Sequence, residues 1–333
     1  MTPSAHPGEK KIRVAVVGVG DFGRNHVRVY RELENAELVG VVDLDRERAE
    51  RIAQEFSTAA LVGIESLAGR VDAVSLVVPT LEHGRIGCQL LEMGFDVLVE
   101  KPIAASLAEA DKLISAASRR GRVLQVGHLE RFNPGLEAVL PVLKRPLYFE
   151  VHRLGVFTPR SLDIDVVYDV MIHDLDILLS LADAPVEEIK AVGIPVLTDK
   201  VDIAHARLTF ASGAVANVTA SRVSTERVRK LRFFQQHEYI SVDFTRQDAL
   251  RIRVGEPGPE PKFDFSTLTA VRQEPLRGEL SAFLESVRSR ATPRVDGAAG
   301  RRALVLADQV MAGIQEHGRR VQWDASVSPR ENP

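Results

Sequence analysis

Short apolar runs alternate with amphipathic segments over the first 127 residues. Five of the runs are almost continuously hydrophobic and rich in valine: IRVAVVG, ELVGVVD, AVSLVV, DVLVE and RVLQVG. Strands that are buried on both faces of a parallel sheet have this pattern. Stretches with helical spacing lie between them, at 23–33, 46–54, 83–93 and 107–119. The repetition of strand and helix predicts a doubly wound parallel α/β sheet.

The pattern changes after His128. Several segments now alternate apolar and polar side chains, as VDIAHARLTF does: 147–154, 189–195, 203–210, 214–221, 229–234, 239–244 and 249–254. Such alternation is typical of an antiparallel sheet with one covered face. A helix is expected at 168–181, a loop at 255–275 and two closing helices at 276–290 and 298–317. We therefore predict one domain at 1–127 and an α+β domain at 128–333 with a large, mostly antiparallel open sheet.

Composition narrows the function classes. With 45% apolar and 27% charged residues the chain has the balance of a water-soluble globular protein, and its net charge of -3 gives no overall attraction to nucleic acid or anionic lipid. Cys88 is the only cysteine, which excludes an intrachain disulfide and a cysteine-based metal site. No secretion signal or apolar run of about 20 residues is present. We expect a cytoplasmic protein without nucleic-acid or membrane partners.

A glycine-rich turn follows the first apolar run. Gly18, Gly20 and Gly23 form GxGxxG between a predicted strand and a predicted helix. The three glycines allow a tight turn, close approach to a pyrophosphate, and close packing of helix on strand. Asp43 ends the second run at about the expected 20 residues, where a carboxylate accepts the ribose hydroxyls of NAD and repels the 2′-phosphate of NADP.

This context predicts a Rossmann domain that binds NAD. Two alternatives stay open. A plain surface turn would leave Asp43 as the cap of the following helix, and the nearby Arg46 and Arg48 offer a phosphate partner for NADP.

Lys101 lies directly after the DVLVE run, in Glu100-Lys101-Pro102. Ligands of doubly wound sheets bind outside the carboxyl ends of the strands. Lys101 is therefore expected near the nicotinamide ribose and the substrate, although a single lysine beside a turn is otherwise a surface residue.

A second group of candidate residues lies on the helix expected at 168–181. Asp169, His173 and Asp176 are spaced i, i+4 and i+7, so an α-helix presents them on one face. An imidazole is suited to accept a hydroxyl proton near neutral pH, and a neighbouring carboxylate can orient it. A histidine alone on an apolar helix would more often belong to the core.

Several segments together resemble the Gfo/Idh/MocA oxidoreductase family over nearly the whole chain: GVGDFGRNH, VVPTLEHG, VLVEKPIA, DVMIHDLD and EPLRGELSAFLESV. The resemblance implies that Lys101, Asp169 and His173 form the active site. It also implies a sheet whose open face contacts another subunit, hence a homodimer or homotetramer. The residues that it implies for cofactor contact are Gly18, Gly20, Asp21, Phe22, Gly23, Asp43, Pro79, Thr80, His83, Glu100 and Lys101.

Two segments, VGHLERFNP and HRLGVFTPRSLDIDVVYDVMIHDLD, resemble one branch of that family. This branch oxidises the 3-hydroxyl of UDP-N-acetylglucosamine, upstream of a 3-amino sugar used in lipopolysaccharide. Family members acting on inositol or glucose usually have a glycine run before the aspartate and a glycine two residues before the histidine. Here these places hold Asp165-Val-Val-Tyr and Met171.

The expected reaction is therefore oxidation of a secondary alcohol on a sugar or nucleotide sugar. His173 removes the hydroxyl proton, Lys101 polarises the oxygen, and hydride passes to the nicotinamide, so that no metal is needed. Guanidinium groups match the oxygens of a diphosphate. Candidate substrate-binding residues are Arg131, Arg153, Arg160, Arg222 and Asp176, although each arginine could equally be solvated at the surface. Two alternatives are a dehydrogenase of a free sugar or polyol, such as inositol or glucose, and a non-catalytic dinucleotide-binding protein.

Overall fold

The computed structural model describes residues 10–158, 162–255 and 262–321, so Arg160 lies outside the described residues. The chain divides into two units, Met1–Leu129 with Glu274–Arg301, and Glu130–Gln273 with Arg302–Pro333. The expected division at 127 and 128 differs from this one by two residues. It also differs because Glu274–Arg301 returns to the first unit.

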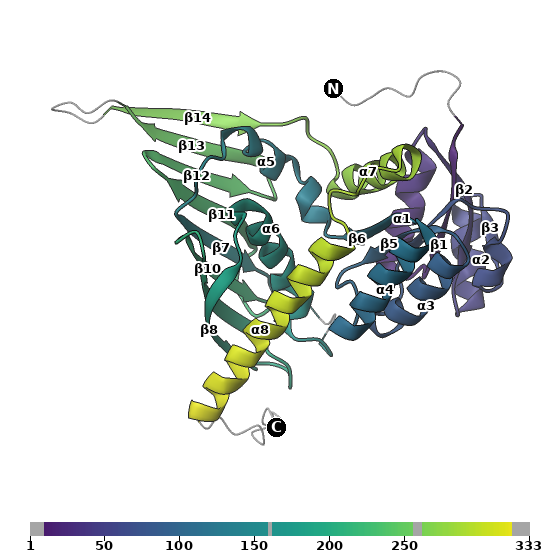
Figure 1. Ribbon diagram of the computed structural model, residues 1–333, viewed down its shortest axis with the longest axis horizontal. Coiled ribbons are helices and arrows are strands. Elements are labelled where there is room, and N and C mark those ends of the chain that lie inside the picture. The colour runs from purple at the N-terminus through teal and green to yellow at the C-terminus, as the bar shows by residue number, and fades with distance from the viewer. Residues whose placement is uncertain (1–9, 159–161, 256–261, 322–333) are drawn as a thin grey trace. The chain divides into compact units, whose positions relative to one another are not determined.

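The first unit contains a parallel sheet (Figure 1). Its strands are β1 (Ile12–Val17), β2 (Ala36–Val42), β3 (Ala59–Leu61), β4 (Ala73–Leu76), β5 (Asp96–Glu100) and β6 (Leu124–Gly127). Its helices are α1 (Asp21–Glu32), α2 (Arg46–Glu55), η1 (Ile64–Leu67), α3 (Thr80–Glu92), α4 (Leu107–Arg120), α7 (Pro275–Ser289) and the start of α8 (Gly297–Val321). Within the described residues the strand order is β3-β2-β1-β4-β5-β6, which confirms the doubly wound fold.

Burial explains the apolar runs of this sheet. Every residue of β4, β5 and β6 is buried, as expected for strands covered on both faces. On α7, Leu280, Phe283 and Leu284 pack into the same core cluster as Val14 and Val16 of β1. This burial assigns α7 to the first unit although it comes late in the sequence. The short strand β3 was not predicted, because three residues give no usable period.

The second unit contains a larger sheet, mostly antiparallel, which confirms the predicted fold class. Its strands are β7 (Tyr148–Leu154), β8 (Val186–Ile194), β9 (Ile203–Phe210), β10 (Val215–Ser221), β11 (Val228–Gln235), β12 (Glu238–Asp243), β13 (Asp248–Val254) and β14 (Phe263–Thr269). The short helices η2 (Leu129–Phe132), α5 (Pro134–Glu137) and η3 (Leu140–Val142) precede β7, and η4 (Val167–Met171) leads into α6 (Ile172–Ala182). In the described part of the chain the strand order is β14-β13-β12-β11-β7-β10-β9-β8, with β7 and β10 parallel.

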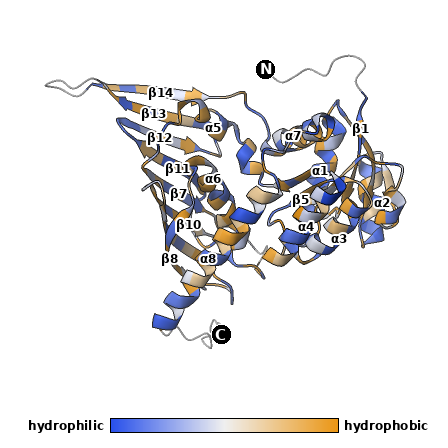
Figure 2. Ribbon diagram, in the orientation of Figure 1, coloured by the Kyte–Doolittle hydropathy of each residue, from blue (hydrophilic) through white to orange (hydrophobic). Residues whose placement is uncertain are grey.

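One face of this sheet is covered by α6 and by the part of α8 after Arg302 (Figure 1). Leu175 and Leu178 of α6 and Val310 of α8 join inward-facing strand residues in one core cluster. Buried and more exposed residues alternate along β9, and the corresponding change of hydropathy along the strands can be followed in Figure 2. The alternation read from the sequence is therefore the consequence of one covered face.

The prediction of a loop at 255–275 was wrong in part, because β14 occupies Phe263–Thr269 and pairs with β13. Phe263 and Phe265 are 56% and 64% exposed, whereas the half-buried Leu268 packs against the core of the second unit. The preceding proline-rich stretch suggested a loop. None of the described helices is long and apolar enough to cross a membrane.

Candidate active site

The glycine turn of the first unit can only be made by glycine at two of its positions. Gly18 has φ +87°, and a Cβ there would lie 2.3 Å from the carbonyl oxygen of Val77. A Cβ on Gly23 would lie 2.0 Å from the carbonyl oxygen of Gly18. The start of α1 therefore packs against the turn after β1 with no room for a side chain. A Cβ on Gly20 would meet nothing within 4 Å, and Gly20 gives α1 no side-chain cap. The turn thus leaves open space and backbone N–H groups where a pyrophosphate would bind.

Asp43 stabilises this turn from the end of β2. Its Oδ2 accepts a hydrogen bond from the Val19 N–H at 2.8 Å, and its Oδ1 accepts one from the Asp45 N–H at 2.9 Å. The residue that caps α2 is Asp45, whose side chain accepts from the Arg48 N–H at 3.0 Å. Asp43 is therefore not the helix cap. Arg48 lies 3.5 Å from Asp43 and 3.0 Å from Asp45, and Arg46 pairs with Glu50 of its own helix.

The turns after β4 and β5 are joined by His83. Pro79 precedes α3, whose first residue is Thr80, and His83 lies one turn further along, 1% exposed. Its Nδ1 is 2.9 Å from the carbonyl oxygen of Pro102, and its Nε2 is 2.9 Å from that of Val78. Burial lowers the pKa of His83, whereas the two carbonyl contacts oppose that shift. His83 thus lies between the two turns, and its neutral ring donates a hydrogen bond to one of the two carbonyls, according to its tautomer.

Lys101 leaves β5 at the carboxyl edge of the sheet. The peptide bond between Lys101 and Pro102 is cis. The buried Glu100 accepts a hydrogen bond on Oε2 from the Lys101 N–H at 3.2 Å, and its Oε1 lies 3.2 Å from Nε2 of His26. Phe22, 38% exposed, packs edge-on against the His26 ring at a centroid distance of 5.2 Å.

The first unit thus gathers its predicted residues at one edge. Because β1, β4 and β5 are parallel neighbours, the turns that follow them share the carboxyl edge of the sheet. The glycine turn with Asp21 at the start of α1, the turn at Pro79, and Lys101 all lie at this edge. These residues fit a dinucleotide: a glycine turn opens onto a helix N-terminus, and a carboxylate lies beside it.

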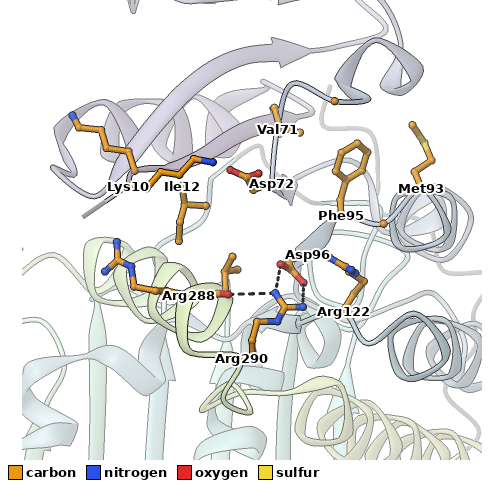
Figure 3. A pocket seen from close by; sticks show the side chains of 14 residues that line it. Lys10, Ile12, Val71, Asp72, Met93, Phe95, Asp96, Arg122, Arg288 and Arg290 are labelled. Carbon is orange, nitrogen blue, oxygen red and sulfur yellow. Dashed lines mark hydrogen bonds and ion pairs between the residues drawn. The ribbon is translucent and has the colours of Figure 1, made fainter. Parts of the chain in front are cut away.

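A separate cavity of about 470 Å³ lies at the opposite edge, near the amino ends of β1 and β5 (Figure 3). Lys10, Ile12, Asp96 and Arg290 are among its lining residues, and Arg290 forms an ion pair with Asp96 at 2.6 Å. None of the predicted site residues lines this cavity. Ligands of doubly wound sheets bind at the other edge, so we assign the chemistry to the carboxyl ends.

In the second unit, Asp169 and His173 lie on a helix whose first turn is π-helical. Asp169 belongs to η4, and His173 belongs to the first turn of α6, with both residues half-buried. The sequence predicted a continuous α-helix at 168–181, so the assumed i, i+4 geometry is altered by the wider turn. Met171 is fully buried in the core. Single π-helical turns occur often at functional sites.

Asp176 and Arg131 form a pair within the second unit. Asp176 is 2% exposed, and both of its carboxylate oxygens lie 3.4 Å from Nη1 of Arg131. The Arg131 side chain keeps 15% exposure. The structure therefore brings together two of the predicted substrate residues.

Arg153 has its donors occupied inside the second unit. Its Nε and Nη2 donate to the two oxygens of Asp174 at 2.8 Å, and its Nη1 donates to Glu130 at 2.9 Å. Its guanidinium also lies over the ring of Phe244. Burial alone would lower the pKa of Arg153, but the two carboxylates outweigh it and raise that pKa. The sequence alone does not single out Asp174, because its partner Arg153 lies 21 residues away and no local motif connects the two.

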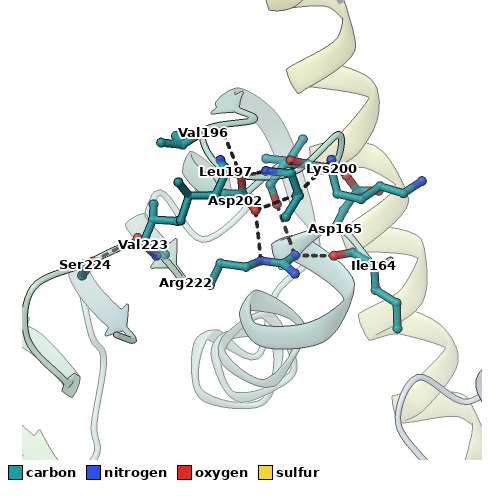
Figure 4. Close-up of polar contacts among 12 residues, drawn as sticks. Ile164, Asp165, Val196, Leu197, Lys200, Asp202, Arg222, Val223 and Ser224 are labelled. Atoms are coloured by element: carbon teal, nitrogen blue, oxygen red, sulfur yellow. Dashed lines mark hydrogen bonds and ion pairs between the residues drawn. The ribbon is translucent and has the colours of Figure 1, made fainter. Parts of the chain in front are cut away.

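Arg222 is buried in a polar cluster that holds the chain before η4 (Figure 4). Its Nη2 donates to the carbonyl oxygen of Ile164, and its Nε lies 3.5 Å from Asp202. Burial would raise the pKa of Asp202, but N–H groups of residues 196–198 and the Thr198 hydroxyl keep it below its usual value. These contacts give Arg222 a supporting position behind the helix of Asp169 and His173.

In the described residues, no group of three or more histidine, cysteine, aspartate or glutamate side chains is arranged to hold a metal ion.

Comparison with known proteins decides the family. Residues 12–128 match the model of an oxidoreductase family with an NAD-binding Rossmann fold, and residues 152–240 match the GFO/IDH/MocA C-terminal domain. The chain belongs to the Gfo/Idh/MocA oxidoreductase family. Its first unit is accordingly an NAD-binding domain, as the glycine turn and Asp43 predicted.

Among its relatives is the UDP-N-acetylglucosamine 3-dehydrogenase of Acidithiobacillus ferrooxidans, 39% identical over 91% of this chain and 97% of the relative. The solved structure of that enzyme has a TM-score of 0.87, with 37% identity over 92% of this chain and 99% of that one. The scyllo-inositol 2-dehydrogenase (NAD(+)) of Bacillus subtilis is 30% identical over 65% of this chain and 69% of the relative. Levoglucosan dehydrogenase in complex with NADH has a TM-score of 0.83 at 16% identity, over 92% of this chain and 98% of that one, and so shares the fold.

Proposed function

We propose that this protein is an NAD-dependent dehydrogenase that oxidises the 3-hydroxyl of UDP-N-acetylglucosamine to the 3-keto sugar. The observation that carries the proposal is the 39% identity to a UDP-N-acetylglucosamine 3-dehydrogenase along 91% of this chain. The scyllo-inositol 2-dehydrogenase (NAD(+)) of Bacillus subtilis is less similar, at 30% identity over 65% of the chain. Lys101, Asp169 and His173 supply the groups that such an oxidation needs.

The proposed chemistry divides between these residues. When bound, NAD supplies the acceptor for the hydride that leaves carbon 3. His173 takes the proton of the 3-hydroxyl, and Asp169 stabilises the resulting imidazolium. The ammonium group of Lys101 stabilises the negative charge that develops on the oxygen. Asp43 and the glycine turn bind the adenosine ribose and the pyrophosphate.

For the substrate, Arg131 is the arginine whose side chain we propose to contact the diphosphate. It lies beside Asp176 and remains partly exposed. Arg153 and Arg222 are paired within the protein, so we propose that they stabilise the helix of Asp169 and His173. We also propose Arg160, which lies outside the described residues, as a second ligand of the diphosphate.

We also propose that the open face of the large sheet joins subunits into a homodimer or homotetramer. An apolar row crosses five neighbouring strands in register on this face: Tyr148, Phe234, Tyr239, Ile252 and Phe265. The rings of Tyr148 and Phe234 are 5.5 Å apart, and those of Phe234 and Tyr239 are 5.1 Å apart. Light scattering should give at least a dimer for the wild type and a smaller species for Phe234→Glu. A wild-type monomer at micromolar concentrations would contradict this assembly.

The proposed product also suggests a cellular role. A 3-keto nucleotide sugar is a substrate for amination, and the 3-amino sugar formed would enter lipopolysaccharide. We place this reaction in the cytoplasm, where nucleotide sugars and NAD are found and where a lone cysteine such as Cys88 stays reduced.

The test is an assay of NADH formation with UDP-N-acetylglucosamine, coupled to a glutamate-dependent aminotransferase that removes the ketone. The proposal predicts NADH formation with this substrate, and its loss in His173→Ala. NADH formed from free inositol or glucose but not from the nucleotide sugar would contradict the proposed substrate. Membership of the Gfo/Idh/MocA family would then be the part of the assignment that remains. If no sugar is turned over, the protein is a non-catalytic dinucleotide binder.

A further inference from the structure

A cluster of buried polar side chains lies within the first unit, next to the turn that Lys101 and Pro102 form after β5. We call this turn the Lys101 turn. Tyr30 of α1 and Ser75 of β4 form a hydrogen bond of 2.8 Å. The other members are His26 of α1, Glu100 of β5, Gln125 of β6 and Glu279 of α7. His26, Gln125 and Glu279 are 0% exposed and Glu100 is 6% exposed. The Glu279 carboxyl group interacts electrostatically with Glu100, so the two buried carboxyl groups share one dry site.

The two carboxyl groups differ in their partners. Glu100 faces Nε2 of His26 at 3.2 Å and accepts the Lys101 N–H, also at 3.2 Å. It also lies close against β6, where a Cβ on Gly127 would be 2.5 Å from its Oε1. The amide of Gln125 donates to the backbone carbonyl of Glu279 and not to its carboxyl group. Among the described residues, neither carboxyl oxygen of Glu279 has a hydrogen-bond partner.

The electrostatic environment indicates which of the two carboxyl groups is protonated. Burial raises the pKa of Glu279 well above its usual value, and the nearby Glu100 raises it further. Two carboxylates in one site of low dielectric constant do not both ionise near neutral pH. A buried charge without hydrogen-bond donors is costly, so the proton belongs on Glu279, whose carboxyl oxygens have no hydrogen-bond partner among the described residues, whereas Glu100 accepts the Lys101 N–H.

We propose that Glu279 is a positioning residue that carries a proton in the working enzyme. Its neutral form places no second negative charge beside Glu100, whose Oε2 accepts the backbone N–H of Lys101. Ionisation of Glu279 would set a second negative charge against Glu100 and disturb the Lys101 turn. The positioning role rests on the proposed function of Lys101, whereas the location of the proton does not.

The first test reads the proton directly. At neutral pH the infrared spectrum should contain the carbonyl stretching band of a protonated carboxyl group that disappears in Glu279→Gln. The matched control is Glu285→Gln, which changes an exposed glutamate of the same helix and should keep the band. A spectrum of Glu279→Gln that retains every such band would overturn the proposal.

The second test uses the pH dependence of thermal unfolding. Because the pKa of Glu279 is raised in the folded state, wild-type stability falls as pH rises from the unfolded pKa of about 4.3 towards the folded pKa. Glu279→Gln lacks this loss. Its Tm relative to wild type should therefore increase steadily from about pH 5 to about pH 8, while that of Glu285→Gln should not. A difference that is independent of pH would overturn the assignment.

The positioning role is read from the alkaline side of the pH profile of kcat. Glu279→Gln should retain kcat at a higher pH than wild type and Glu285→Gln, because its side chain cannot ionise. Superimposable alkaline profiles would reduce Glu279 to a structural residue. If wild type oxidises no sugar, the proposed function fails, while the infrared and unfolding measurements still locate the proton. NAD affinity over the same pH range would then report on the Lys101 turn.

Discussion

The two units hold their functional residues by different means. In the first unit, backbone geometry dominates: Gly18 and Gly23 permit a turn that other residues would block, and Asp43 accepts two backbone N–H groups. In the second unit, the helix of Asp169 and His173 is supported by buried charged side chains. Arg153 joins Asp174 and Glu130, and Arg222 supports the segment before η4.

This difference predicts how each unit responds to substitution. A backbone turn fails when a side chain is added, and the effect stays local. A buried ion pair fails when one partner is removed, because the other charge is left without compensation in a dry environment. The second unit should therefore depend more strongly on single charges.

The largest expected effect is on stability. Arg153→Met should lower the free energy of unfolding by about 3–5 kcal/mol, because Asp174 and Glu130 would be left buried without their cation. The control Arg232→Met removes a half-exposed arginine paired with Glu150 and should cost at most about 1 kcal/mol. Urea unfolding measures both. Equal losses for the two variants would show that burial does not determine the cost of removing an arginine from an ion pair in the second unit.

The next effect is on catalysis. His173→Ala should lower kcat by about two orders of magnitude or more, with NAD affinity almost unchanged, since the general base is lost. Lys101→Ala should lower kcat by a similar factor, whereas Lys112→Ala, on an exposed position of α4, should not. Steady-state kinetics and NAD titration check these values. Near-normal turnover of His173→Ala would reduce its helix to a structural role.

The smallest effect concerns cofactor choice. NAD should bind at least about tenfold more tightly than NADP, about 1.4 kcal/mol, because Asp43 repels a 2′-phosphate. Asp43→Ala should reduce the ratio of the affinity for NAD to the affinity for NADP. Asp45→Ala, which removes the cap of α2, should cost about 1 kcal/mol of stability and leave the ratio unchanged. Fluorescence titration of both dinucleotides decides, and equal affinities in the wild type would contradict the role of Asp43.

The sequence predicted those parts of the fold that are encoded locally. Valine-rich runs identified the strands of the parallel sheet, and alternation identified most of the larger sheet. It did not predict β14, because Phe263 and Phe265 remain exposed, nor the return of α7, because its partners Val14 and Val16 are distant in sequence.

The candidate site shows the same limit. The glycine turn, Asp43 and Lys101 follow from motif and strand order, which are local. The π-helical turn at Asp169 could not be predicted, because a single turn gives no repeating pattern of apolar residues in the sequence. The pairing of Arg153 with Asp174 and the burial of Glu279 beside Glu100 depend on tertiary contacts, which one sequence does not reveal.

The central claim is hydride transfer from carbon 3 of UDP-N-acetylglucosamine to NAD. It is tested most directly with substrate that carries deuterium at carbon 3, followed by mass spectrometry of the reduced cofactor and of the trapped ketone. The account predicts that the deuterium appears in the reduced nicotinamide and is absent from the sugar. Deuterium retained in a sugar that has been oxidised would place the reaction at another carbon and contradict the account.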